Sequence, residues 1–450
     1  MYLRRATIYD AELLLKWAND ETVRQNSFNT NKITREEHYA WFNGVIKSSD
    51  VTIFVLYDKE PVGTVRIKYI DDFAELSYSI GREYRGKGYG TLIIQYAEAE
   101  AIKNDKVCSI VAEVKYENVP SQKIFKKLGY TESVCEGHLR YKKQIDKIIG
   151  FRVDANAQIA SGHAMRCITY AKRLVKKGQS VIFFTADEEG ANFIAGKGIA
   201  SILLDSKYNR LDEELDIFEN YIKLYRLDYL IIDSYFATVS YLAALQRIVK
   251  TVYIDDLLSF AYPVDYIVNY AVYAEEKEYK KLYDGECPKL FLGMEYAPIR
   301  DEFKQVKYIK RPFIKNVLIT MGGGNSSEIS EEIVKVLLKD NRFNNITFHI
   351  VVGEFAECNF KNDRVIIHKN VTNMAELMAE CDFMISAGGF TLYEAYTVGI
   401  PCVSVLIADN QMRNVKKFDE MEAISYMGYI KENKNAVLKN ICMNMAKERQ

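Results

Sequence analysis

A glycine-rich stretch early in the chain has the composition of an anion site. It lies between a predicted strand at 74–81 and a predicted helix at 91–104. Glycine lets backbone N–H groups approach a phosphate closely, and the N-terminus of the following helix adds unpaired donors. The stretch therefore predicts a phosphate site with added positive charge; a plain strand-to-helix turn is the alternative. It consists of Arg85, Gly86, Lys87, Gly88, Tyr89 and Gly90.

A histidine follows another predicted strand, at 148–155. Gly162 and His163 lie on a polar loop between this strand and a helix predicted over 164–174. Parallel sheets bind ligands at the carboxyl ends of their strands. The positive end of a helix disfavours a charged imidazole, so His163 would be a neutral base near pH 7. The alternative is a histidine that caps the helix or packs with satisfied hydrogen bonds.

Charged residues stand on both sides of this loop. Arg152 and Asp154 end the strand, and Arg166 lies in the first turn of the helix. They either orient the loop or the substrate, or form an ion-pair cluster that anchors the helix. The residues alone leave the two interpretations equal.

Two further glycine-rich turns follow predicted strands late in the chain. Two such turns on consecutive strand–helix units can face one crevice, where their amides and helix dipoles suit a diphosphate. The first turn holds Gly322, Gly323, Gly324 and Asn325, and the second holds Ser386, Gly388 and Gly389.

Polar residues after the second turn have two interpretations. Thr391 and Glu394 have the spacing of a capping box, in which the carboxylate binds the Thr391 amide. Glu394 could equally accept hydrogen bonds from ribose hydroxyls. Asn410 and Gln411 follow the next strand, where they either approach a diphosphate or sugar or belong to a polar loop.

The order of predicted elements divides the chain into three ranges. Residues 1–146 mix helices with a strand hairpin, which predicts a small α+β domain. Residues 147–308 and 309–450 alternate strand and helix, a pattern typical of a parallel sheet with helices on both faces. We therefore predict an α+β domain followed by a two-lobed α/β domain, in which each lobe is Rossmann-like.

Composition excludes several classes of protein. The 450 residues carry 60 Lys and Arg against 61 Asp and Glu, so no basic excess favours nucleic acid or a membrane surface. No apolar run is long enough to span a membrane and no signal peptide is visible, so we expect a cytoplasmic protein. The eight cysteines include no CxxC pair. We therefore expect buried free thiols, no disulfide framework and no obligatory metal.

Most of residues 1–145 resemble the GCN5-related N-acetyltransferases. The family's cradle, R/Q-x-x-G-x-G/A, is matched by Arg85, Gly88 and Gly90. The resemblance implies acetyl-CoA as co-substrate, with its pyrophosphate on the amides of residues 85–90. The family's second motif, N-x-x-[AS]-x-x-x-[YF]-x-x-x-G-[FY], is matched by Asn118, Ser121, Phe125, Gly129 and Tyr130.

One position departs from that family. Many members have a tyrosine where this chain has Phe125, and that tyrosine protonates the leaving thiolate. Tyr130 or Tyr116 could take its place, or the CoA thiolate leaves unassisted. Glu75, at the start of the strand beside the cradle, is our candidate for the base that deprotonates the amine; an exposed strand-end carboxylate is the alternative.

The remaining two ranges resemble the UDP-2,4-diacetamido-2,4,6-trideoxy-β-L-altropyranose hydrolases of pseudaminic acid synthesis. Similar segments occur in order at 151–167, 233–235, 254–257, 293–303, 386–395 and 409–411. The resemblance implies the two-lobed glycosyltransferase-B scaffold, with His163 as the residue that activates water. The residues that would hold the UDP-sugar are Arg152, Asp154, Gly162, Arg166, Tyr235, Gly322, Gly323, Gly324, Asn325, Ser386, Gly388, Gly389, Thr391, Glu394, Asn410 and Gln411.

Together the two resemblances imply a bifunctional enzyme. The first domain would acetylate the 4-amine of a UDP-4-amino-4,6-dideoxy sugar, and the second would hydrolyse the product to UDP and free sugar with inversion at C1. The alternatives are a glycosyltransferase with a UDP-amino sugar donor and a non-catalytic nucleotide-sugar-binding protein. The sequence leaves open the stereochemistry of the sugar, the general acid, channelling and the oligomeric state.

Overall fold

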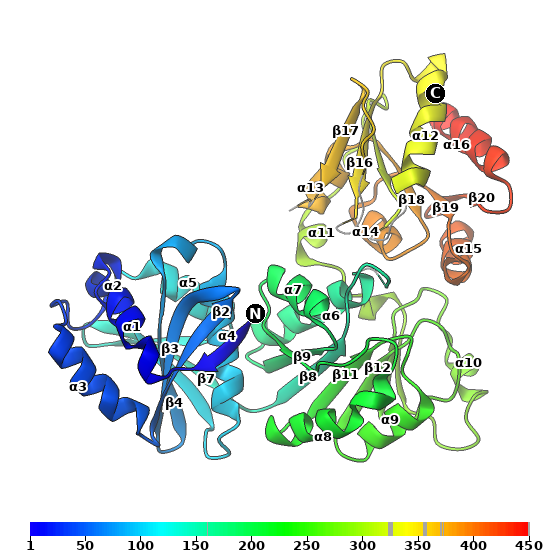
Figure 1. Cartoon of the computed structure of the whole chain (residues 1–450). Helices are drawn as coiled ribbons and strands as arrows, with labels where there is room; N and C mark the ends of the chain where they lie inside the picture. Colours follow the sequence, from blue (N-terminus) through cyan, green and yellow to red (C-terminus); the bar gives the residue numbers. More distant parts are fainter. Residues whose placement is uncertain (160, 323–326, 354–357, 370, 372, 449–450) are drawn as a thin grey trace. The chain divides into compact units, whose positions relative to one another are not determined.

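The computed structural model describes residues 1–159, 161–322, 327–353, 358–369, 371 and 373–448. Within these residues the strands form three sheets, which follow one another along the chain (Figure 1). The first is a mostly antiparallel sheet, and the other two are built from strands that alternate with helices. The predicted fold class, an α+β domain followed by α/β lobes, is confirmed.

The first sheet has the strand order β1-β2-β3-β4-β5-β7-β6. Its central pair, β4 and β5, is parallel, and the register extends only to the pair Glu75 and Val111. Both strands continue beyond that pair, so they part there and leave backbone groups of each strand without a partner in the other. The strands are β1 (Tyr2–Arg5), β2 (Val51–Asp58), β3 (Glu60–Ile70), β4 (Phe73–Ile80), β5 (Ser109–Val114), β6 (Thr131–Cys135) and β7 (His138–Gln144).

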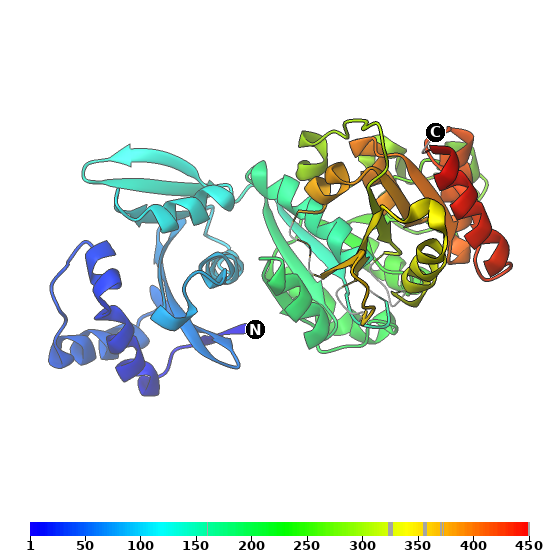
Figure 2. The same cartoon turned by 90° about the horizontal axis from the view of Figure 1, so that it is seen from above.

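Helices cover both faces of this sheet. On one face Trp17 and Phe42 pack on β2, and on the other Ile93 and Phe125 join a larger apolar core. Figures 1 and 2 show α1 to α3 on the first face and α4 on the second. Thr34 is the N-cap of α3 and forms a capping box with Glu37. The helices are α1 (Ala11–Ala18), α2 (Glu21–Asn26), α3 (Arg35–Ile46), α4 (Tyr89–Ile102) and α5 (Val119–Lys127).

The second sheet has the order β10-β9-β8-β11-β12-β13-β14. The interior strand β8 is parallel to both neighbours and buried along its whole length, because helices cover both faces. The strands are β8 (Ile148–Val153), β9 (Ser180–Thr185), β10 (Ser201–Leu203), β11 (Tyr229–Asp233), β12 (Lys250–Ile254), β13 (Tyr266–Asn269) and β14 (Lys289–Leu292). The helices are α6 (Gly162–Lys176), α7 (Glu188–Gly196), the 3-10 helix η3 (Leu211–Glu214), α8 (Leu215–Leu224), α9 (Val239–Gln246) and α10 (Glu276–Lys280).

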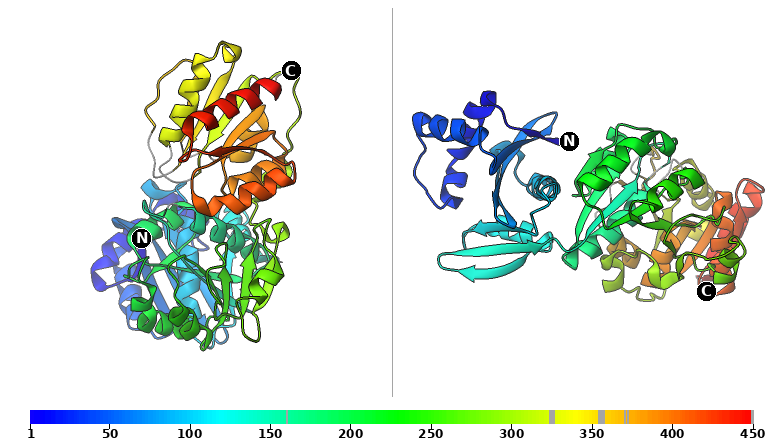
Figure 3. Two further views of the ribbon diagram at one scale, coloured as in Figure 1. Left: turned by 90° about the vertical axis from the view of Figure 1, so that its right-hand side faces the viewer. Right: turned by 90° about the horizontal axis from the view of Figure 1, so that it is seen from below.

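The third sheet is parallel, with the order β17-β16-β15-β18-β19-β20. The strand order reverses between β15 and β18, which is the position where open α/β sheets bind ligands. Helices α12 and α16 lie side by side (Figures 1 and 3). The strands are β15 (Asn316–Thr320), β16 (Thr347–Val352), β17 (Val365–Lys369), β18 (Phe383–Ala387), β19 (Cys402–Leu406) and β20 (Ser425–Tyr429). The helices are α11 (Asp301–Gln305), α12 (Ser327–Lys339), α13 (Met374–Glu380), α14 (Thr391–Val398), the 3-10 helix η6 (Asp409–Gln411), α15 (Met412–Glu420) and α16 (Lys434–Glu448).

Contacts group the chain into two compact units. The first contains residues 1–154, 170–253 and 262–265, and the second contains 155–169, 254–261 and 266–450. The loop with His163 therefore belongs to the same unit as the third sheet. The three predicted domain boundaries stay a prediction. In the described part of the chain, every helix is too short or too polar to cross a membrane.

Candidate active sites

The glycine cradle at the start of α4 adopts the backbone that its composition predicts. Gly86 and Gly88 have φ values of 75° and 89°, a left-handed conformation that strains other residues. Gly88 is the N-cap of α4, whose first turn begins at Tyr89. A Cβ on Gly90 would lie 2.7 Å from Ile124 Cδ1, so this glycine lets α4 approach α5. Backbone N–H groups at this helix end suit a phosphate.

The side chains of the cradle contribute less charge than the sequence predicted. Arg85 donates to Asp20 Oδ1 at 2.6 Å and to the Ile80 carbonyl at 3.1 Å, so a carboxylate already neutralises its guanidinium. Lys87 lies over the Tyr84 ring, 5.7 Å from its centroid. The Tyr89 hydroxyl donates to Asp58 at 2.5 Å, and burial together with this carboxylate raises the pKa of Tyr89 to about 12.

The second motif builds the local structure beside the cradle. Asn118 is the N-cap of α5, and its side chain accepts from the Ser121 amide at 3.3 Å. The Ser121 hydroxyl is buried and lies 3.1 Å from the hydroxyl of Tyr78 on β4. Both motif side chains therefore have partners within the domain.

Tyr130 is a core residue, contrary to the prediction that it protonates the thiolate. It is 5% exposed, and its ring packs edge-on against Phe125 with centroids 5.0 Å apart. Burial and the neighbouring Glu98 carboxylate raise the pKa of Tyr130. A phenol enclosed in this way cannot reach a thiolate at an open site. Tyr116 donates its hydroxyl to the Cys135 carbonyl at 2.9 Å.

Tyr78 is a phenol that the sequence analysis did not single out. It lies on β4 past the last residue that pairs with β5, and its ring is 6.2 Å from that of Phe125 in an edge-on arrangement. Burial raises the pKa of Tyr78, so its hydroxyl keeps its proton at neutral pH. Tyr78 thus offers an O–H group close to the position where related proteins have a tyrosine.

Glu75 lies where β4 and β5 part, as its place in the strand predicted. Alternation along the strand puts it on the face opposite Ala74 and Leu76, which belong to the core under α4. Glu113 of β5 and Arg140 of β7 lie on the same face as Glu75. A hydrogen bond with Glu113 raises the pKa of Arg140, and the charge of Glu75 adds a smaller effect.

Arg152 and Asp154 form a buried ion cluster, which is the second of the two interpretations that the sequence left open. Arg152 is fully buried; it donates to both oxygens of Glu214, at 2.6 and 2.9 Å, and to Asp154 at 2.6 Å. The second Asp154 oxygen accepts from Thr185 and Ala186. Burial alone would lower the pKa of Arg152, but the two carboxylates raise it. The cluster fastens β8 to β9 and to η3.

His163 is the second residue of α6, so it lies in the first turn of the helix and not on the loop before it, as the sequence had predicted. Its Nδ1 lies 3.1 Å from a terminal nitrogen of Arg166. A guanidinium only donates hydrogen bonds, so Nδ1 accepts and the proton of the neutral ring is on Nε2. This contact occupies the lone pair that a base would use.

Arg166 joins His163 to two other strand ends in the same compact unit. Its other terminal nitrogen donates to Asp256 at 2.9 Å and to the Tyr270 hydroxyl at 2.7 Å. Asp256 follows β12 and Tyr270 follows β13. The side chain of Arg166 is only 7% exposed, and its ion pair with Asp256 is compatible with both roles that the sequence left open.

The turn after β18 brings several predicted residues together. Gln411 accepts from the Gly388 amide at 3.2 Å, and a Cβ on Gly388 would lie 2.2 Å from Val415 Cγ2. Gly322 after β15 has a φ of 87°. Gly323, Gly324 and Asn325 lie outside the described residues.

The other predicted residues are placed as follows: Ser386 is buried in β18, Gly389 precedes α14, Asn410 is exposed in η6, Gly162 begins α6, and Tyr235, after β11, is 42% exposed.

Glu394 does not close a capping box with Thr391. The N-cap of α14 is Phe390, and Thr391 is the first helical residue. The Glu394 carboxylate is buried and accepts two hydrogen bonds from Arg300, at 3.1 and 2.9 Å. Burial raises the pKa of Glu394, and Arg300 opposes this effect.

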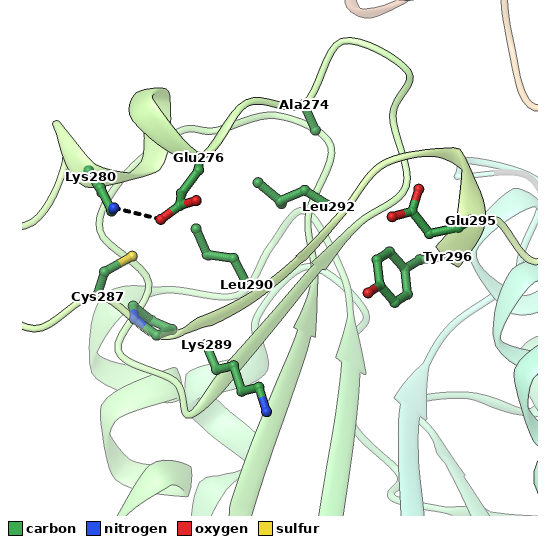
Figure 4. Close-up of a pocket in the computed structure, with 10 residues that line it drawn as sticks. Ala274, Glu276, Lys280, Cys287, Lys289, Leu290, Leu292, Glu295 and Tyr296 are labelled. Carbon is green, nitrogen blue, oxygen red and sulfur yellow. Dashed lines mark ion pairs between the residues drawn. The ribbon is translucent and has the colours of Figure 1, made fainter.

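A pocket of about 590 Å³ lies along β14 and contains none of the predicted site residues. Figure 4 shows the ion pair of Glu276 and Lys280 at one end, with Glu295 and Tyr296 at the other. The residues missed near the predicted sites are Tyr78, Asp256, Tyr270 and Arg300. Asp256 and Arg300 lie in segments that resemble the hydrolases, so this resemblance could have identified them as site residues.

Comparison with known proteins assigns the first domain. Residues 1–131 match the family described as Acetyltransferase (GNAT) domain. These residues form a GNAT acetyltransferase domain. Residues 308–450, outside the acetyltransferase domain, match a family described as Protein of unknown function (DUF354).

Curated relatives cover the chain in part. An uncharacterized protein of Methanocaldococcus jannaschii, MJ1062, is 29% identical over 302 residues, which are 62% of this chain and 59% of that protein. The chain therefore spans less than two thirds of the length of this relative. The UDP-2,4-diacetamido-2,4,6-trideoxy-beta-L-altropyranose hydrolase of Campylobacter jejuni is 26% identical over 272 residues, which are 58% of this chain and 92% of that protein.

A solved structure also resembles the chain. Spermidine N-acetyltransferase from Vibrio cholerae in complex with CoA and spermine has 18% identity and a TM-score of 0.30, and covers 32% of this chain and 94% of that one. The recognition made from the sequence is confirmed: an acetyltransferase domain lies in a chain that is also similar to a UDP-sugar hydrolase.

Removing Glu214 should destabilise the second sheet, because the loss leaves Arg152 buried with one partner fewer. We expect Glu214→Ala to lower the free energy of unfolding by about 3 kcal/mol. Urea unfolding followed by circular dichroism measures the change. The neighbouring Glu213→Gln is the control, since its ion pair with Arg210 is 58% exposed on both sides and should contribute nothing measurable. Equal effects of the two variants would contradict the assignment.

Proposed function

We propose that the chain is a bifunctional enzyme of nonulosonate synthesis. It acetylates the 4-amine of a UDP-4-amino-4,6-dideoxy sugar and then hydrolyses the resulting UDP-diacetamido-trideoxyhexose to UDP and free sugar. The supporting observation is that a GNAT domain occurs in a chain that is similar to a hydrolase of such a sugar nucleotide. Acetylation of an amino sugar produces the kind of substrate that such a hydrolase consumes.

In the acetyl transfer, the pyrophosphate of acetyl-CoA rests on the backbone of residues 85–90, with Asn118 and Ser121 shaping the neighbouring helix. The sugar amine attacks the thioester carbon, and the C–S bond breaks as the tetrahedral intermediate collapses. Glu75 takes the amine proton through water. Tyr78 gives its hydroxyl proton to the departing thiolate, the role for which Phe125 has no donor.

Tyr78→Phe should slow acetyl transfer and leave acetyl-CoA binding unchanged. The expected loss in turnover is ~10²-fold, the lower end for a general acid, because a thiolate is a good leaving group. Free CoA measured with a thiol reagent reports turnover, and calorimetry reports binding. Tyr69→Phe is the control, since Tyr69 is a partly buried tyrosine on β3 whose pKa is also raised by burial. Full turnover of Tyr78→Phe would remove Tyr78 from the chemistry.

In the hydrolysis, the UDP diphosphate is held by the glycine turns after β15 and β18, with Gln411 beside Gly388. Glu394 accepts the ribose hydroxyls. His163 takes a proton from the water that attacks C1, the C1–O bond breaks, and UDP leaves with inversion. For this step Arg166 must release Nδ1 of His163, and Asp256 and Tyr270 are the partners that keep its charge satisfied meanwhile.

His163→Asn should lose about 10²–10⁴ in turnover, the usual contribution of a general base. UDP binding should stay near the wild-type value because the glycine turns hold the nucleotide. Phosphorus NMR of UDP release and calorimetry with UDP measure the two quantities. His368→Asn, on the edge strand β17, serves as the control. A His163→Asn enzyme with full turnover would contradict this assignment.

The order of the two reactions is tested by proton NMR of the products. With the UDP-4-amino sugar and acetyl-CoA, we expect free CoA first and then UDP with the free diacetamido sugar as its inverted anomer. Without acetyl-CoA, release of UDP should be much slower. CoA release that does not depend on the amino sugar would reject the acceptor. Transfer of the sugar to an added acceptor, or binding without turnover, would favour the alternatives.

A further inference from the structure

A corner of the acetyltransferase domain brings a carboxylate, a thiol and an imidazole together. Cys135 ends β6 and His138 begins β7, and the two residues face each other across a tight turn in which Gly137 has a φ of 76°. Glu113 lies on β5, opposite Arg140 of β7. One potential ligand atom from each of Glu113, Cys135 and His138 lies within 4.8 Å of the other two.

The hydrogen bonds of this corner fix which atoms face one another. Nδ1 of His138 lies 3.0 Å from the Glu136 carbonyl, which only accepts, so Nδ1 carries a proton. Arg140 donates to Oε1 of Glu113 at 2.7 Å. Oε2 of the same carboxylate is buried and has no hydrogen-bond partner among the described residues. It contacts Nε2 of His138 instead.

Three potential ligand atoms therefore converge at this corner. Oε2 of Glu113 contacts Nε2 of His138, and the thiol of Cys135 lies beside both. Either a proton shared by the nitrogen and the oxygen or a metal ion bound by both satisfies this contact. The thiol of Cys135 favours the metal, because thiolate, imidazole and carboxylate are together the ligands that Zn²⁺ prefers.

The surroundings also have the arrangement of a metal site. Histidine ligands of zinc donate their second nitrogen to a carbonyl or carboxylate, as His138 does to Glu136. Carboxylate ligands are held by an outer partner, as Arg140 holds Glu113. A tight turn between Cys135 and His138 sets the two residues in advance, so little chain entropy is lost on binding.

We propose that Glu113, Cys135 and His138 bind one Zn²⁺ ion, with a fourth position open to water. On binding, Cys135 releases its proton to solvent and coordinates as the thiolate, while His138 coordinates through Nε2 and Glu113 through Oε2. The site lies on the sheet face opposite the core under α4. It is independent of the acetyl and UDP-sugar chemistry proposed above, and it differs from the expectation that no metal is bound.

Cobalt provides a spectroscopic test, because a thiolate–Co²⁺ bond gives a charge-transfer band in the near ultraviolet. The full chain, stripped with a chelator and reduced, is titrated with Co²⁺. We expect the band to saturate at one ion per chain and to disappear when Zn²⁺ is added. Cys135→Ser should abolish the band, and His138→Ala should weaken Co²⁺ binding by more than the ~10-fold that loss of an outer partner costs.

Cys108→Ser is the matched control, since Cys108 is an exposed thiol in the same domain and should leave the band unchanged. Circular dichroism confirms that each variant is folded, and Cys135→Ser is nearly isosteric. If the wild type gives no band at one ion per chain, or Cys135→Ser keeps it, the proposal is overturned. In that case a proton on Nε2 joins His138 and Glu113 as an ion pair.

Discussion

The position of His163 depends on the hydrogen bonds that the guanidinium of Arg166 makes. One side chain holds His163, Asp256 and Tyr270, which belong to three separate segments of the chain. Arginine does not deprotonate in proteins, so the imidazole nitrogen that it contacts is forced to accept. The same contact makes the position of Arg166 part of any proton transfer at this ring.

The elements that the sequence predicted well are the buried ones. Strands β8, β15 and β18 are mostly apolar because helices cover both of their faces. The edge strands β6 and β17 were missed because each has only five residues, and β6 is also largely polar. Their pairing depends on a neighbouring strand, which a local pattern does not contain.

In the candidate sites, too, features set by the local sequence could be predicted and features set by distant residues could not. Glycine turns could be predicted because the backbone itself requires glycine, as at Gly88. Partners distant in the chain could not: Glu214 neutralises Arg152, and Arg300 holds Glu394, only because folding brings them together. Tyr78 has a similar explanation. It is placed by the register of β4 with β3 and β5, which a local pattern does not contain.

Two charged clusters in this chain differ in the partners that their polar groups find. Around Arg152 a buried cation meets two carboxylates, and each group finds partners of the opposite kind, so nothing further is needed. At Glu113 and His138 the arrangement is different, because a carboxylate oxygen and an imidazole nitrogen that contact each other lie beside a thiol. Carboxylate, imidazole and thiolate are ligand types that Zn²⁺ prefers. Two of the three already have an outer partner, Arg140 for Glu113 and the Glu136 carbonyl for His138, as metal ligands usually do.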